Sequence, residues 1–435
     1  MFICFELFIL QYNIFSVIIK QSYLDEKFRF KFEGKMSNIK KYCICTTVYS
    51  VGFTFCTGAV MQTFLIQAGF SAEQVYLLNS LMQIMQVVTM LALTFLSGKI
   101  KCVKMVTSIS HLSLTILTVV FLLGAINPEL IKHGYIITVF IVAGISYVGV
   151  GLYTILSYCL PYYTIDMKEY GKMTGISTAI AGGVSFLMSL AYSLLLSKFS
   201  YMKITSAFFV LAIVCFIITS IVCASMRVKS AEMNKDGNEK NDIIAVFKNK
   251  NMYLLLVPNF TRGLAVGIFN VIATIAISTS ILNETTSSYL NVILQIATFA
   301  GNMFFAFAYK KLSTKKLLLL ATIGVSISFP FSLELGIVGF FCCFTVASFF
   351  RFVIDTAIPV IITEIIPKEQ IGPYTSIRML IFTGAQAVAT LIITPLNSLI
   401  GYTGVLIFAT VMLFICGITY FLVAKKVKQS PCKQD

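Results

Sequence analysis

The chain has 435 residues, of which 58% are hydrophobic and 12% are charged, whereas soluble domains carry about 25% charged residues. This composition excludes an ordinary soluble protein, because so much apolar surface cannot be kept from water without a bilayer. The net charge of +15 does not indicate a nucleic-acid partner, since the basic residues lie between long apolar runs.

The first 35 residues differ from the rest of the chain. An apolar, aromatic run at 1–19 contains Glu6, and a charged stretch at 20–35 follows it, ahead of the second methionine, Met36. No small-residue cleavage site of the signal-peptide kind is visible. We expect 1–35 to be an extension that is either not translated or cytoplasmic, and the alternative is an additional amphipathic or membrane-spanning segment.

Twelve apolar runs follow. A membrane-spanning helix needs about 20 mostly apolar residues, and backbone inside a bilayer must pair its own polar groups, so each run is predicted to be helical. The predicted spans are 42–67, 73–97, 103–125, 135–160, 173–198, 203–225, 252–280, 286–308, 316–333, 336–363, 374–400 and 402–424. The expected fold is therefore an all-α, multi-pass membrane protein in contact with the lipid bilayer.

The positions of lysine and arginine predict the orientation. If the N-terminus is cytoplasmic, 28 of the 33 basic residues fall on the cytoplasmic side, three fall outside (Lys132, Lys198 and Lys203) and two lie within spans (Arg262 and Arg351). Basic residues favour cytoplasmic loops. We therefore expect both termini to be cytoplasmic and the protein to lie in the cell membrane.

An internal repeat relates the two halves of the chain. Residue pairs recur at a constant spacing of 212: Asn79 and Asn291, Gln83 and Gln295, Lys99 and Lys311, and Lys104 and Lys316. Six spans per repeat give parallel halves related by an axis along the membrane normal, with the solute pathway between them.

This repeat predicts two bundles of six helices. The bundles are expected at 36–226 and 251–428, joined by a cytoplasmic linker at 227–250 and followed by a cytoplasmic tail at 429–435. The linker is too short to fold as a catalytic or nucleotide-binding domain.

These features resemble the major facilitator superfamily over 36–428. Members carry a short basic loop after span two and after span eight, and an acidic segment with proline and glycine after span ten. The residues that match these loop motifs are Lys99 and Lys104, Lys311 and Lys316, and Glu364 and Gly372. Gly98 and Lys310 replace the family's acidic loop residues, so the charge latch they form in the family is not expected. The resemblance implies a twelve-helix, two-bundle fold whose spans one, four, seven and ten line a central cavity.

Three ionisable residues lie inside predicted spans and are functional candidates, because burying a charge in a membrane costs several kcal/mol. Arg262 in span seven and Asp355 in span ten both lie about ten residues, or roughly 15 Å, from the cytoplasmic face. Arg351 is four residues from Asp355, on the same helical face. Three roles are open for this coupling or gating cluster: proton exchange at Asp355, binding of a substrate anion by one arginine, or a permanent structural bridge.

Hydroxyl and amide side chains in spans one and four are candidates for contact with the solute. They are Tyr49, Thr54, Gln62, Tyr147, Tyr153 and Tyr158. Ordinary packing between membrane helices is the alternative explanation.

Catalysis, cofactors and metals are not expected. The sequence contains no Walker-type glycine loop, its twelve cysteines form no Cys-x-x-Cys pair, and we place His111 and His133 apart at membrane edges. No nucleophile has a base at a recognisable spacing.

The function that these observations favour is secondary active transport of a small organic solute by alternating access, coupled to a proton or another gradient as a symporter or an antiporter. A cation-coupled sugar symporter is an alternative, although the aspartates that the similar sodium-coupled glycoside symporters carry in spans two and four are missing here. Multidrug efflux is equally open. A non-transporting membrane sensor or assembly factor is the alternative from another class.

Overall fold

A computed structural model of the chain describes seven segments, and every secondary-structure element in them is a helix. These segments are 37–96, 103–127, 134–164, 167–227, 250–308, 311–365 and 371–429. The predicted extension at 1–35 and most of the predicted linker and tail lie outside the described residues.

The first half of the chain forms six antiparallel rods, two of which are interrupted. The helices are α2 (Asn38–Cys56), α3 (Gly58–Gln67), α4 (Ala72–Leu96), α5 (Val103–His111), α6 (Ser113–Ile126), α8 (Tyr135–Thr164), α9 (Met167–Leu196) and α10 (Tyr201–Ala224). The first rod consists of α2 and α3, and it is interrupted at Thr57, whose backbone is extended (φ −136°, ψ −177°). The third rod consists of α5 and α6.

The second half repeats this pattern. Its helices are α12 (Lys250–Asn270), α13 (Ile272–Ser278), α14 (Glu284–Ser287), α15 (Tyr289–Ala308), α16 (Thr314–Ser328), η2 (Pro330–Leu333), α17 (Gly336–Ile365) and α18 (Ile371–Gln429). The long α18 turns back at Gly401, where φ is +68°. Because glycine has no Cβ, it adopts this left-handed conformation without steric cost, and α18 therefore supplies the last two rods.

The helices correspond to the predicted spans one by one. By length and apolar composition alone, eight of the described helices are able to cross a membrane, or nine if the bent pair α12 and α13 counts as one span. That count is below twelve partly because the stretch Tyr374–Val423 counts once, although Gly401 divides it into two rods. Large aliphatic and aromatic side chains are exposed along the helices, as expected for surfaces that contact lipid.

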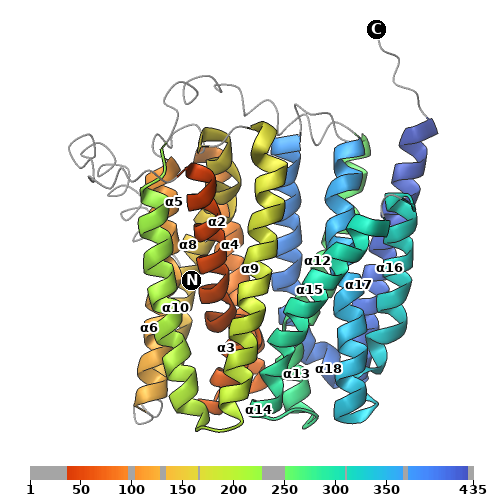
Figure 1. Ribbon diagram of the computed structural model, residues 1–435. Coiled ribbons are helices and arrows are strands. Elements are labelled where there is room, and N and C mark those ends of the chain that lie inside the picture. The colour runs from red at the N-terminus through yellow and green to blue at the C-terminus, as the bar shows by residue number, and fades with distance from the viewer. Residues whose placement is uncertain are drawn as a thin grey trace.

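Two hydrophobic cores divide the molecule into two bundles (Figure 1). One core joins buried residues of the first half, and the other joins mainly residues of the second half. The bundles meet where α4 packs on α18, α9 on α15, and α3 on α13. We call the face where α2 begins and α18 ends the terminal side, and the face that carries α3, α13 and α14 the far side (Figure 1).

A close approach of helices inside the second bundle depends on two glycines of α12. A Cβ at Gly263 would lie 2.5 Å from the carbonyl oxygen of Phe382, and a Cβ at Gly267 would lie 2.7 Å from the Cβ of Ala389. Both neighbours belong to α18. The glycines thus let the backbone of α12 pack directly against α18. This contact fixes the orientation of the polar face of α12.

We expect Gly263→Leu to destabilise the protein by about 1–3 kcal/mol, because the added side chain overpacks this contact. Gly182→Leu is the matched control, since no described atom lies within 4 Å of a Cβ at that helical position. Melting temperatures in detergent compare the two. Equal melting temperatures for the two variants would contradict this account of the α12–α18 contact.

Candidate functional site: a buried charge cluster

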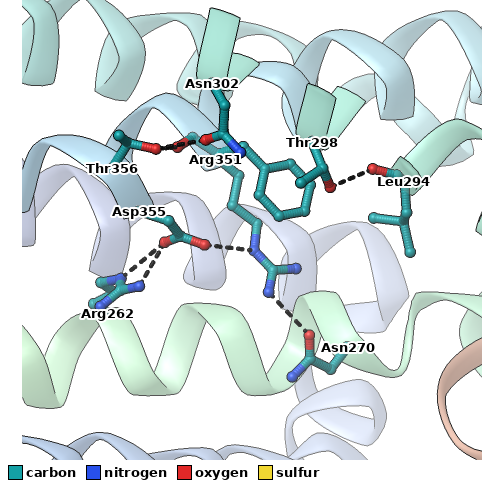
Figure 2. Close-up of polar contacts among 9 residues, drawn as sticks. Arg262, Asn270, Leu294, Thr298, Asn302, Arg351, Asp355 and Thr356 are labelled. Carbon is teal, nitrogen blue, oxygen red and sulfur yellow. Dashed lines mark hydrogen bonds and ion pairs between the residues drawn. The ribbon is translucent and has the colours of Figure 1, made fainter. Parts of the chain in front are cut away.

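The three ionisable residues from the middle of the predicted spans lie together in the second bundle. Arg262 projects from α12, and Arg351 and Asp355 project from α17 (Figure 2). The Nη2 and Nε atoms of Arg262 donate to Oδ1 of Asp355 at 2.5 and 3.2 Å. Asp355 Oδ2 lies 3.8 Å from Nε of Arg351. One carboxylate therefore serves two guanidinium groups, and its shorter contact crosses between helices.

Aromatic rings shield both arginines. The guanidinium carbon of Arg262 lies 4.6 Å from the ring centre of Phe382, and that of Arg351 lies 4.6 Å from the ring centre of Phe269. A guanidinium over an aromatic face gains electrostatic attraction, and the gain increases when water is excluded. These contacts offset part of the cost of holding two cations inside the membrane.

Asn270 extends the cluster toward the far side. It is the last residue of α12, and its Oδ1 accepts a hydrogen bond of 3.1 Å from Nη2 of Arg351 (Figure 2). Asn270 was not predicted from the sequence as part of the site. A usable signal was its spacing of eight residues from Arg262, which places both polar side chains on one face of a helix. A neighbouring bond joins the Thr356 hydroxyl to Oδ1 of Asn302 on α15 at 2.7 Å.

The cluster has a surplus of one positive charge when Asp355 is ionised. The side chains of Arg262, Arg351 and Asp355 are 13%, 14% and 25% exposed, so all three are largely removed from solvent and Asp355 is the most accessible. Proton binding to Asp355 would leave two cations uncompensated. The arrangement can therefore bind a proton, an anion or a polar solute, and each event changes the electrostatic energy of the other two.

The first bundle places several predicted solute contacts inside its own core. Tyr49 and Tyr147 are buried, and Tyr49 packs its ring centre 4.3 Å from that of Tyr153.

His111 was expected at a membrane edge, but that placement is wrong. Its ring is buried against Tyr49 and Tyr153, and its Nδ1 pairs with the carbonyl of Thr107 at 2.6 Å. This bond satisfies one ring nitrogen and makes the burial tolerable.

The other predicted contacts lie in different settings. Thr54 is partly exposed, and its hydroxyl donates to the carbonyl of Ser50 in the same helix at 2.8 Å. Gln62 is buried, and its hydrogen bonds cross to the second bundle. Tyr158 lies in α8, and its side chain is outside the described residues. Among the described side chains of these candidates, Thr54 and Tyr153 are the two that are only partly buried.

The predicted loop motifs lie on the terminal side of the molecule. Lys104 is the second residue of α5. Lys311 and Lys316 are exposed around the start of α16. Gly372 lies in the first turn of α18. Lys99 and the side chain of Glu364 lie outside the described residues.

Comparison with known proteins identifies the class of this fold. Residues 255–433 match the family model of the Major Facilitator Superfamily. Among the solved structures that resemble the chain, a D-xylose–proton symporter has a TM-score of 0.67 at 13% identity, with 89% of this chain and 97% of that chain covered. The nucleoside transporter NupG has a TM-score of 0.61 at 14% identity, with 90% and 98% covered. The E. coli fucose:proton symporter FucP has a TM-score of 0.60 at 13% identity, with 90% and 98% covered. No curated protein matches the sequence.

The fold is therefore that of a secondary transporter with twelve helices in two bundles. The second half of the chain matches the Major Facilitator Superfamily, and the fold of both halves resembles that of solved transporters. This fold, shared with solved transporters of small solutes, agrees with the fold predicted from the sequence.

We expect Asp355→Ala to lower the free energy of unfolding by about 3–5 kcal/mol, because it leaves two buried arginines without their carboxylate. Adding Arg262→Met to that variant should restore part of the loss, since the shortest ion pair is then removed as a unit. Thermal unfolding in detergent is measured for the parent protein, for each of the two single variants and for the double variant. Additive losses in the double variant would show that Arg262 and Asp355 are not energetically coupled.

Proposed function

We propose that the protein is a proton-coupled secondary transporter of a small polar organic solute and that Asp355 carries the coupling proton. The observation that supports this role most directly is the sharing of one accessible carboxylate between arginines on two helices. Two of the structurally similar proteins are proton symporters of xylose and fucose. That similarity agrees with proton coupling.

The charge on Asp355 links proton binding to the contact between α12 and α17. Ionised Asp355 holds Arg262 at 2.5 Å and draws Arg351 to 3.8 Å. Protonation removes the attraction to both arginines, so α12 and α17 lose their strongest polar connection. A ligand that binds one protonation state better than the other shifts the equilibrium between conformations by that difference in affinity.

We further propose that the terminal side faces the cytoplasm and that the membrane is the cell membrane. The predicted loops on that side hold most of the 33 lysine and arginine residues, and cytoplasmic loops are enriched in these residues. Anionic lipid headgroups on the cytoplasmic leaflet add to the attraction. On this orientation the far side faces out of the cell.

Transport of an organic anion is a second candidate, and a specific observation favours it. The buried Nε of Arg351 has no hydrogen-bond partner among the described residues, and the cluster holds two cations against one anion. A carboxylate or phosphate group on the solute would supply the missing negative charge and accept from the guanidinium in a bidentate manner.

We expect Asp355→Asn to abolish uphill, proton-driven accumulation, because the amide cannot exchange a proton, while solute exchange without a gradient continues. Flux measurements in reconstituted vesicles with and without a pH gradient provide the test. Glu334→Gln is the matched control, since Glu334 is an exposed acid that bonds Thr403 on the far side and should leave both activities intact. Retained uphill accumulation in Asp355→Asn would refute the coupling role.

For the anion candidate, we expect Arg351→Met to weaken binding of anionic solutes by about 10- to 150-fold, the range for loss of a charged hydrogen bond. Arg351→Lys keeps the charge and should retain part of the affinity. Competition between a labelled solute and panels of anionic and neutral solutes measures both variants. Equal losses for the two panels would exclude recognition of an anion by Arg351.

A further inference from the structure

Span seven is broken where it reaches the far side. The helix α12 ends at Asn270 and α13 begins at Ile272, with their axes 46° apart. At the break, Val271 has φ −106° and ψ 15°. In a continuous helix the Asn270 carbonyl would accept from the backbone N–H of Thr274, four residues later. The bend leaves these two backbone groups, of which the Thr274 N–H is buried, in need of other partners.

Gln62, on the opposite bundle, supplies both partners. Its Nε2 donates to the Asn270 carbonyl at 2.7 Å, and its Oε1 accepts from the Thr274 N–H at 3.1 Å. The Thr274 hydroxyl donates to the same Oε1 at 3.0 Å. The Gln62 side chain is 1% exposed. One buried amide from α3 therefore replaces the missing turn of helix in the other half of the molecule.

The internal repeat shows that this contact lies across the axis between the halves. Gln62 and Thr274 are 212 residues apart, the same spacing that relates Asn79 to Asn291 and Gln83 to Gln295. Around this contact, the Thr63 and Ser287 hydroxyl oxygens lie 2.8 Å apart, and hydrogen bonds between the bundles continue along the far side. These hydrogen bonds join the two bundles on the far side.

Asn270 connects this contact to the charge cluster. Its main-chain carbonyl accepts from Gln62, and its side-chain Oδ1 accepts from Nη2 of Arg351 at 3.1 Å. Arg351 in turn lies beside Asp355. A continuous series of polar contacts thus runs from the first bundle, through the break in span seven, to the carboxylate.

We propose that Gln62 is the latch that keeps the far side closed and that Asn270 is the positioning residue through which the charge cluster controls it. The second part rests on the proposed function, because it takes the state of the cluster as the signal. When Arg351 leaves Asn270, the end of α12 is free to turn, and the geometry that presents the Asn270 carbonyl and the Thr274 N–H to Gln62 is lost. Events at Asp355 or Arg351 are in this way transmitted to the opening of the far side.

A tryptophan reporter tests the latch. The chain contains no tryptophan, so Tyr76→Trp introduces a single emitter at a buried position of α4 whose hydroxyl bonds Tyr402 of the other bundle at 3.4 Å. Acrylamide quenching of this emitter in the purified protein is low when the bundles are closed. We expect Gln62→Ala to shift the equilibrium toward an open far side about tenfold or more, given the loss of three hydrogen bonds, and to raise the quenching accordingly.

Gln67→Ala is the matched control. Gln67 is also a glutamine of α3 that reaches the second bundle, but it makes one exposed bond of 3.3 Å, to Glu284. We therefore expect Gln67→Ala to leave the quenching of the tryptophan at position 76 the same as in the protein that carries Tyr76→Trp alone. Thr274→Val removes a single bond to Gln62 and should give an intermediate value, which also provides a milder test if Gln62→Ala does not fold. Unchanged quenching in a folded Gln62→Ala or Thr274→Val protein would overturn the latch.

A double-mutant cycle in the same reporter tests the connection. Asn270→Ala removes the bond to Arg351 and keeps the carbonyl that Gln62 binds. We expect Asn270→Ala and Arg351→Met each to raise quenching, and the double variant to equal the larger single effect. Additive effects would overturn the role of Asn270. Because quenching needs neither solute nor a proton gradient, it separates failure of the latch from failure of the proposed coupling at Asp355.

Discussion

The structure depends on one carboxylate that neutralises cations inside a membrane. Without Asp355, α12 and α17 would each bring an arginine into a region where an uncompensated charge costs several kcal/mol. With it, the two helices are joined by a contact of 2.5 Å and retain a surplus of positive charge. That surplus makes the cluster responsive, because any proton or anion that enters changes the balance between the helices. The close α12–α18 contact at Gly263 and Gly267 holds Arg262 at the depth where this pairing occurs.

Much of the fold and part of the site follow directly from the sequence. Long apolar runs can satisfy their backbone only as helices, so the twelve rods were predictable, and the cost of buried charge was enough to single out Arg262, Arg351 and Asp355. The break at Val271 was not predictable, because it depends on an amide that arrives from the other bundle. For the same reason the sequence did not predict that Gln62 bonds the other bundle. The burial of Tyr49 also depends on its neighbours, since a tyrosine in a membrane helix suits a packed core and a polar cavity equally well.

The two bundles use their polar residues differently. The first bundle encloses an aromatic group around Tyr49, Tyr153 and His111, and its hydroxyl groups mostly bond their own helices. The second bundle concentrates the ionisable groups and the surplus charge. The buried ionisable cluster therefore belongs to one bundle only, and the first bundle has a neutral aromatic core in its place. This asymmetry arises within a fold whose two halves remain related by a constant spacing.

The interruption at Thr57 has a consequence for how the molecule moves. The first rod is broken between α2 and α3, and the seventh is broken between α12 and α13 at a nearly equivalent place in the repeat. Each bundle therefore has a hinge part-way along one of its rods, and the short segments beyond the hinges can tilt while the longer inner segments keep their packing. Tilting of these two segments breaks no continuous ladder of helical hydrogen bonds, because the ladder is already interrupted at Thr57 and Val271.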